Sequence, residues 1–285
     1  MAKERRIYTL NGLPPEVVAV AFAKTSRSPE SFDAIARELN EDKTRQFHEK
    51  WVVGYGHSSV AEHAVLSIAV ENVSRLAIEV IQANRLASYT EKSSRYQLFD
   101  KEDYYTPATI VGSAYAEEYA QATEKLYAAY YLCVEKLTTF FKNQMPLKPE
   151  DKPGMYDARM KVKAIDCARF LLPCSAFANV GVTINARSLE HALVKMFSHP
   201  LAEVREVGAR IKEECVKVTP TLLKYTNPSD YLINSDKKLL EKAKASNLAA
   251  STDKAYDVKL VDFDENAVDK LIATLLYKSS GLSYS

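Results

Sequence analysis

The sequence predicts an α+β (α/β) fold, in which a mixed β-sheet is packed with long α-helices. Apolar and polar residues alternate from Val65 to Asn72, which is the pattern of a β-strand. From Val73 the apolar residues follow a helical period instead, and residues 114–142 form a long helical pattern rich in alanine and tyrosine. A strand and a helix that both end at polar loops make a rigid frame for a site.

The remaining predicted elements are helices, apart from one strand. Proline favours the first turn of a helix and stops a helix that has already formed. These elements are, in chain order, a proline-started helix over residues 14–28, one or two helices over 30–55, a helix that stops at Pro173, a strand over 175–184, and helices that begin at Arg187 and Ala202.

The composition is that of a globular protein, since 47% of the 285 residues are hydrophobic and 26% are charged. A net charge of +1 argues against a nucleic-acid partner. The sequence shows no long apolar run and no signal peptide, so we expect a cytoplasmic protein without a membrane partner. The four cysteines lack metal-ligand spacing, which predicts free thiols and no metal site.

Two polar segments flank the predicted strand and helix. The turn before the strand contains His57, Glu62 and His63, and the segment after the helix, residues 86–97, reads LASYTEKSSRYQ. Charged and hydroxyl-rich segments are common at the solvated ends of ordinary elements, so composition alone does not make these a site.

The order of the residues in these segments resembles that of the flavin-dependent thymidylate synthases. That family has a Gly-His-x-Ser-x-x-Glu-His turn, a strand, a helix with Ser-Arg near its start, an Arg-His-Arg group, seven residues and a serine. Further along it has Arg-x-x-Leu-Pro and then Asn-x-Arg-Ser-Leu. The matching positions are Gly56, His57, Ser59, Glu62, His63, Ser74, Arg75, Arg85, Ser93, Arg169, Leu172, Pro173, Asn185, Arg187, Ser188 and Leu189.

This resemblance covers about residues 14–225 and implies a flavin-dependent thymidylate synthase-like fold. It implies an enzyme, a methyltransferase of nucleotide biosynthesis that converts deoxyuridylate (dUMP) to deoxythymidylate (dTMP). FAD would be the cofactor, with methylenetetrahydrofolate and NADPH as co-substrates. Members of the family are homotetramers whose active sites are shared between subunits, so a homo-oligomer is expected here.

The resemblance also implies roles for individual residues. The flavin contacts would be His57, Ser59, Glu62, Arg85, Asn185 and Arg187. The nucleotide contacts would be Glu91, Ser93, Arg95 and Arg169, with Arg169 and Ser93 closest to catalysis and Arg169 as the phosphate anchor. Arginines suit these roles because a guanidinium binds phosphate bidentately and polarises carbonyl groups. The alternative for each is a structural salt bridge, above all for Arg187, because an arginine at a helix start often pairs locally.

Three positions depart from the family pattern. Ala83 and Asn84 replace the first two residues of the Arg-His-Arg group, and Met196 stands where the family has an arginine that holds the pyrimidine. Arginine and histidine placed there are expected to project into the site. Two hypotheses remain: an active synthase, or a relative acting on another pyrimidine nucleotide, and a non-catalytic copy that binds flavin or nucleotide and serves assembly.

Cys174 allows a different mechanism. It follows Pro173, and the unrelated folate-dependent thymidylate synthases use a cysteine after a proline as nucleophile. No general base is adjacent to Cys174 in the sequence, and buried cysteines more often act as small core residues. We therefore expect Cys174 to be structural.

The last part of the chain differs from the rest. We expect a domain over residues 1–229, a helical linker over 230–260 and a C-terminal helix over 261–285. The C-terminal helix aligns without gaps with the first predicted helix, pairing Val17 with Leu271 and Phe22 with Leu276. Either two amphipathic helices are alike by chance, or a second, truncated repeat begins near residue 262. In the second case a dimer would replace the tetramer.

Overall fold

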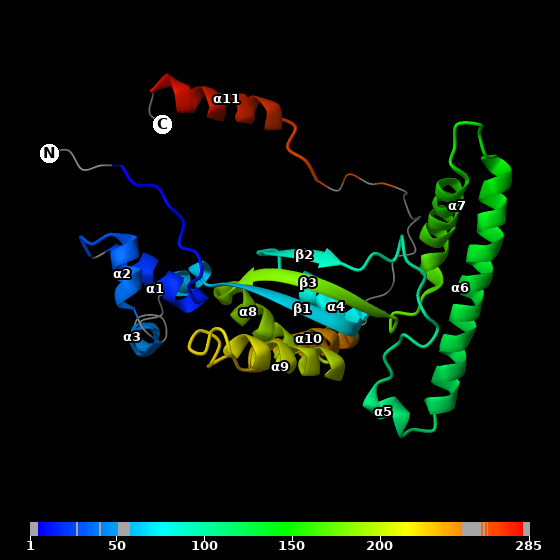
Figure 1. Ribbon diagram of the computed structural model, residues 1–285, viewed down its shortest axis with the longest axis horizontal. Coiled ribbons are helices and arrows are strands. Elements are labelled where there is room, and N and C mark those ends of the chain that lie inside the picture. The colour runs from blue at the N-terminus through cyan, green and yellow to red at the C-terminus, as the bar shows by residue number, and fades with distance from the viewer. Residues whose placement is uncertain are drawn as a thin grey trace. The chain divides into compact units, whose positions relative to one another are not determined.

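The computed structural model describes residues 5–26, 28–39, 41–50, 58–246, 258, 260 and 262–281. The chain forms two compact units, residues 1–238 and residues 239–285. The first unit contains the sheet and almost all of the predicted site residues (Figure 1).

The sheet has three strands, β1 (Val65–Ser74), β2 (Ala87–Glu91) and β3 (Phe177–Asn185), in the order β1-β3-β2. β1 and β2 both pair with β3 in the antiparallel direction. The α+β class is confirmed, but the prediction of mixed strand directions is wrong for the described residues. The reason is that β3 inserts between β1 and β2, which run the same way, so no neighbouring strands are parallel.

Strand β2 lies in residues 86–97, the hydroxyl-rich segment in which the sequence predicts no strand. Its burial alternates: Ala87, Tyr89 and Glu91 are half-buried, while Ser88 and Thr90 are exposed. Serine and threonine on the exposed face hide the apolar alternation by which a strand is normally recognised.

One face of the sheet carries the main hydrophobic core. Helices α4 (Arg75–Gln82), α8 (Ala186–Phe197) and α9 (Ala202–Val216) cover this face, and α8 and α9 are drawn below the strands in Figure 1. The alternation predicted for β1 is confirmed, because Leu66 and Val70 are buried in this core while Ser67 and Ala69 are exposed. The core residues from β3 are Ala178, Val180, Val182 and Ile184.

Strand β1 continues two residues beyond its predicted end because it contains a bulge. The register with β3 shifts between Val70 and Val73, and Asn72 has a positive φ of 56°. Asparagine tolerates this conformation better than most residues, and the Asn72 backbone N–H donates to Asn179 Oδ1 at 2.9 Å. The strand then passes directly into α4, whose N-cap is Ser74; its hydroxyl accepts the Ala77 N–H at 3.1 Å.

The other helices of the first unit form two groups. The N-terminal group consists of α1 (Pro15–Thr25), α2 (Phe32–Glu38), α3 (Glu41–Phe47) and the 3-10 helix η2 (Ser58–His63). The second group consists of α5 (Ala108–Val111), α6 (Ala116–Gln144), α7 (Pro153–Ala168) and the 3-10 helix η3 (Arg169–Leu171). Helices α6 and α7 lie side by side (Figure 1), and Tyr127 and Tyr130 pack against Ala164 and Ile165.

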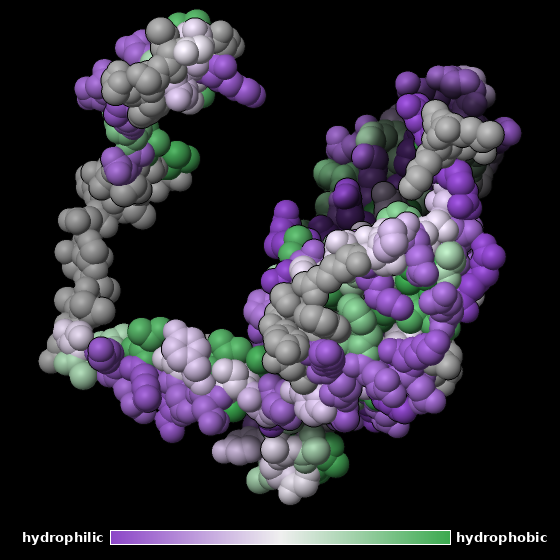
Figure 2. Space-filling view, turned by 90° about the vertical axis from the view of Figure 1, so that its left-hand side faces the viewer, coloured by the Kyte–Doolittle hydropathy of each residue, from purple (hydrophilic) through white to green (hydrophobic). Residues whose placement is uncertain are grey.

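The last two helices are α10 (Asp230–Ala245) and α11 (Ala267–Ser280). Helix α10 is amphipathic: its apolar residues gather on one side and its hydrophilic residues on the other (Figure 2). Among the helices that the structure describes, none combines the length and the apolar character needed to cross a membrane.

A buried histidine, His48, gives the fold a predicted pH dependence. His48 follows α3, and its Nε2–H donates to the Glu16 carbonyl at 3.1 Å. Burial lowers the pKa of His48 below its ordinary value of 6.5, against a smaller opposing effect of that hydrogen bond. The folded state therefore favours the neutral ring. The contribution of His48 to the free energy of unfolding is present above pH 6.5 and is lost as pH falls through the lowered pKa. Burial raises the pKa of the Glu16 carboxyl, so its effect on stability has the opposite sign. The contribution of Glu16 to the free energy of unfolding is lost as pH rises from 4.5 through the raised pKa.

We therefore expect the free energy of unfolding to fall as pH is lowered from about 7 to about 5, and to fall less in His48→Gln. Urea titrations of both proteins across this range measure the difference. An equal slope in the two proteins would assign the pH dependence to another group.

Candidate functional site

The predicted flavin contacts that the structure describes gather at one end of the sheet. Val65 pairs with Asn185 across β1 and β3, and the Ala186 N–H donates to the Ala64 carbonyl at 2.8 Å, which ties the end of η2 to the start of α8. The start of β2 lies opposite Ile184 in the same region. Ser59, Glu62, Arg85, Asn185 and Arg187 are thereby brought to this end, whereas His57 lies outside the described residues.

Two of these residues contact each other. Arg187 Nη1 forms an ion pair with Glu62 Oε1, so the local salt bridge considered for Arg187 exists and its partner is another predicted flavin contact. Asn185 caps α8, since its Oδ1 accepts the Ser188 N–H at 2.8 Å. Glu62 borders two hollows, one of about 490 Å³ shared with Ser59 and one of about 290 Å³ shared with Asn185.

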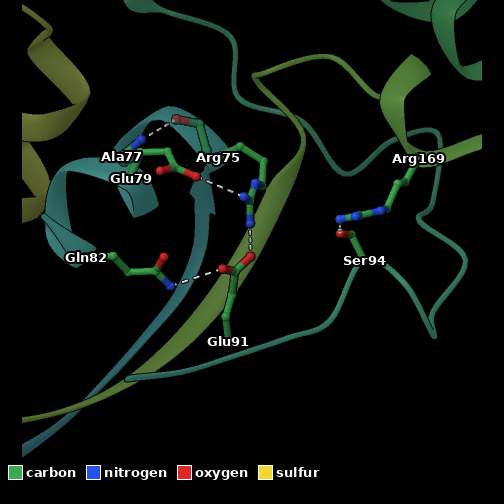
Figure 3. Close-up of polar contacts among 8 residues, drawn as sticks. Arg75, Ala77, Glu79, Gln82, Glu91, Ser94 and Arg169 are labelled. Atoms are coloured by element: carbon green, nitrogen blue, oxygen red, sulfur yellow. Dashed lines mark hydrogen bonds and ion pairs between the residues drawn. The ribbon is translucent and has the colours of Figure 1, made fainter. Parts of the chain in front are cut away.

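The predicted nucleotide contacts gather at the opposite end of β2. Glu91 ends this strand, Ser93 and Arg95 follow it, and Arg169 approaches from the end of α7. Arg169 Nη1 donates to Ser94 Oγ at 3.4 Å across 75 positions of sequence (Figure 3). The guanidinium of Arg169 also lies over the ring of Phe170, 4.9 Å from its centroid.

Glu91 is already held by two side chains of α4. Arg75 Nη1 pairs with Glu91 Oε1, and Gln82 Nε2 donates to Glu91 Oε2 at 3.0 Å (Figure 3). Arg75 also pairs with Glu79 at 3.0 Å. Arg75 and Gln82 were not predicted to belong to the site, and the period of α4 gave no signal for them, because their partner Glu91 lies in the strand that the sequence did not reveal.

The two groups of predicted contacts are separate in one chain. At about 3.3 Å per residue, the four steps from Ala87 to Glu91 span about 13 Å. In space, the predicted flavin contacts lie at the end of β2 that starts with Ala87, and the predicted nucleotide contacts lie at the end marked by Glu91. The predicted flavin contacts and the predicted nucleotide contacts therefore form two separate groups, called half-sites below, at opposite ends of β2.

Two of the three residues that depart from the family pattern, Asn84 and Met196, are buried in the interior. The expectation that side chains at these positions face the site is therefore wrong for both. Asn84 is buried, and its Nδ2 donates to the Ile81 carbonyl at 3.1 Å at the end of α4. The Tyr89 hydroxyl donates toward the carbonyls of Ile81 and Asn84, and burial raises the pKa of Tyr89. Only Ala83 is exposed.

Met196 is fully in the main core. Its side chain is 2% exposed and packs in the cluster between α8 and α9. A Cβ added to Gly208 would come within 3.0 Å of Met196 Cβ, which shows how closely the two helices approach here. A residue at 196 therefore does not reach the surface on which Arg95 and Arg169 lie.

Cys174 lies in the turn between η3 and β3. It is exposed, and its carbonyl accepts the Leu76 N–H at 3.4 Å. The exposure of Cys174 corrects the idea that it is a small core residue, while its lack of a catalytic role stays a prediction. Among the described residues, no group of histidine, cysteine and acidic side chains is arranged to hold a metal ion.

Comparison with known proteins relates this chain to a family. The family described as "Thymidylate synthase complementing protein" matches residues 10–221. A "UPF0159 protein" of Chlamydia muridarum is 26% identical over 312 aligned positions, which cover 98% of this chain and 59% of that protein. The chain thus spans about three-fifths of the length of this relative and of a second one from Chlamydia pneumoniae, where the share is 58%.

A shorter relative covers most of both chains. A "Flavin-dependent thymidylate synthase" of Clostridium tetani is 30% identical over 228 positions, 78% of this chain and 85% of that protein. Among solved structures, a UMP/dUMP methylase PolB from Streptomyces cacaoi, bound with 5-Br dUMP, has a TM-score of 0.51 and 19% identity, and the match covers 73% of this chain and 88% of that one. That likeness shows the fold. The family match over residues 10–221 and the identity to the Clostridium tetani protein show that this chain belongs to the thymidylate synthase complementing protein family.

Proposed function

We propose that the chain is part of a flavin-dependent thymidylate synthase, a methyltransferase that converts dUMP to dTMP in the cytoplasm. Methylenetetrahydrofolate would supply the carbon and NADPH the reducing equivalents. The observation that carries the proposal is the meeting of Arg95, Ser94 and Arg169, which come from two segments more than 70 positions apart. Two guanidinium groups beside hydroxyls are the donors that a phosphate monoester requires.

The chemistry proposed for these residues is binding and orientation. Arg169 would anchor the phosphate, Arg95 would share it, and Ser93 would contact the base or sugar. Glu91, held by Arg75 and Gln82, would offer a fixed acceptor to the nucleotide. No protein nucleophile is needed, since the reducing chemistry belongs to the cofactor.

The donor set at the other end of β2 fits FAD. The hydroxyl of Ser59 and the amide of Asn185 each line one of the two hollows that Glu62 borders, and the guanidinium of Arg187 is paired with Glu62 itself. Bound FAD would supply the hydride for the reaction. Arg187 would exchange its ion pair with Glu62 for a contact with the cofactor.

The separation of the two half-sites supports an assembly of several copies. A second copy of the chain can place its flavin end beside the nucleotide end of the first, which β2 keeps about 13 Å from its own flavin end. We propose a homotetramer, or a dimer if a second copy of the domain follows in the same chain. Helix α11 supports the latter: Leu271 and Leu276 are exposed, whereas their counterparts in α1, Val17 and Phe22, are buried and half-buried.

A second candidate is a catalytically weak copy, or one that acts on another pyrimidine nucleotide. It is favoured by Asn84 and Met196, which are built into the interior where the family pattern has charged or ring donors. Such a chain would keep the binding of flavin or nucleotide and contribute to assembly. Formation of dTMP by the purified chain with FAD, dUMP and both co-substrates would exclude this alternative.

The nucleotide site is tested by Arg169→Ala. We expect the dissociation constant for dUMP to rise by about 10- to 100-fold, since losing a charge-assisted contact costs about 1.5–3 kcal/mol. Isothermal titration calorimetry measures the change. Arg159→Ala is the matched control, because Arg159 lies in α7, the helix that leads into Arg169, but pairs with Asp151. Equal affinity of wild type and Arg169→Ala, or no binding by either, would remove the nucleotide site.

A further inference from the structure

One carboxylate, that of Asp166, joins the two arginines of the proposed nucleotide site. Arg95 binds it side-on, with Nε 3.1 Å from Oδ1 and Nη2 3.2 Å from Oδ2. Arg169, three residues further along the chain, forms an ion pair in which its Nε lies 3.0 Å from Asp166 Oδ1, and its Nε–H also donates to the Asp166 backbone carbonyl at 3.3 Å. Asp166 is therefore the direct link between the loop after β2 and the end of α7.

The contacts leave part of each guanidinium available. Arg95 uses its Nε and Nη2 for Asp166, and Arg169 uses Nε for Asp166 and Nη1 for Ser94. Within the described part of the chain, Nη1 of Arg95 and Nη2 of Arg169 have no acceptor. Each guanidinium thus keeps donors for a ligand while its position is fixed by Asp166.

Two like charges are held close together only if something offsets their repulsion. Asp166 does so, because two guanidinium groups and one carboxylate leave a net charge of +1 for an incoming anion. A phosphate monoester gains most from donors that are already oriented when it arrives, since less side-chain freedom is lost on binding.

We propose that Asp166 is a positioning residue for the phosphate of the nucleotide, holding Arg95 and Arg169 together with their remaining N–H groups free. The inference rests on the proposed function and adds to it the residue that organises the phosphate subsite. Asp166 is not a contact of the nucleotide itself. Asp166 is not one of the site residues predicted from the sequence.

The carboxylate of Asp166 can also oppose phosphate binding, because it repels an anion and competes for the same N–H donors. These side chains are between 32% and 55% exposed, so water screens this repulsion, and surface ion pairs of this kind are weak. Positioning and competition predict opposite signs: loss of the carboxylate weakens phosphate binding in the first case and strengthens it in the second.

The test is Asp166→Asn in the full 285-residue chain. We expect the dissociation constant for dUMP, measured by calorimetry, to rise about tenfold, or about 1.4 kcal/mol. The affinity for deoxyuridine, measured by its displacement of dUMP, should stay unchanged because deoxyuridine lacks the phosphate. Asp166→Glu, which restores a carboxylate, should recover part of the lost dUMP affinity. If Asp166 had a purely structural role, its replacement would change the affinities for dUMP and for deoxyuridine alike.

Asp151→Asn is the matched control, since Asp151 pairs with an arginine of the same helix, Arg159, away from the site. It should bind dUMP like wild type. Equal or tighter dUMP binding by Asp166→Asn, or an equal loss for deoxyuridine, would overturn the inference while leaving the nucleotide site in place. Absence of dUMP binding by wild type would instead overturn the proposed function, and the role of Asp166 with it.

Discussion

Replacing Met196 with arginine is expected to destabilise the fold by about 4 kcal/mol or more and to add no contact with a nucleotide. The side chain at this position is buried in the core between α8 and α9, which approach so closely at Gly208 that a Cβ there would lie 3.0 Å from Met196 Cβ. A guanidinium there would be buried among apolar residues of the main core such as Leu193 and Val204. The free energy of unfolding, from denaturant titration followed by circular dichroism, measures the cost.

The control for this substitution is Met196→Leu, which keeps the volume and apolar character and should cost less than about 1.5 kcal/mol. If Met196→Arg unfolds at the same denaturant concentration as wild type, the arginine must reach solvent or a ligand. Position 196 would then belong to the site after all, and restoring the family's arginine would be a sensible route to activity.

Met196 also illustrates how far the sequence could predict the site. The sequence predicted a helix that stops at Pro173, a strand over 175–184 and a helix from Arg187, and in the structure Arg169 follows α7, Asn185 ends β3 and Arg187 lies in the first turn of α8. The sequence could not reveal that position 196 turns inward. The direction of a side chain on α8 depends on where α9 packs, and that contact joins distant parts of the chain.

The same limit explains the missed partners of Glu91. The sequence predicted β1 from its alternation and α4 from its period, and both exist. Strand β2 was not predicted, since its exposed face carries Ser88 and Thr90 and its partner β3 is almost 100 positions away along the chain. Without that strand, Arg75 and Gln82 had no reason to meet Glu91. Long-range pairing, more than local propensity, decided which polar residues became neighbours.

Replacing Glu203 with alanine is expected to destabilise the protein by about 3–5 kcal/mol, because two buried donors would lose a charged acceptor. Glu203 on α9 accepts the Ser74 backbone N–H at 2.7 Å and the Ser74 hydroxyl at 2.5 Å. Both residues are buried, and Glu203 also borders a hollow of about 710 Å³. Ser74 caps α4, and the next residue, Arg75, is the partner of Glu91.

Loss of this anchor should therefore affect the site as well as the fold. In a Glu203→Gln variant, which keeps the size and one acceptor, we expect a smaller loss of stability and a measurable loss of dUMP affinity at temperatures where the variant is fully folded. Glu206→Ala is the control: Glu206 lies on the same helix but is exposed and pairs with Arg210 on the surface, so its loss should cost less than about 0.5 kcal/mol. Equal stabilities of Glu203→Ala and Glu206→Ala would show that α4 is held by its apolar face alone.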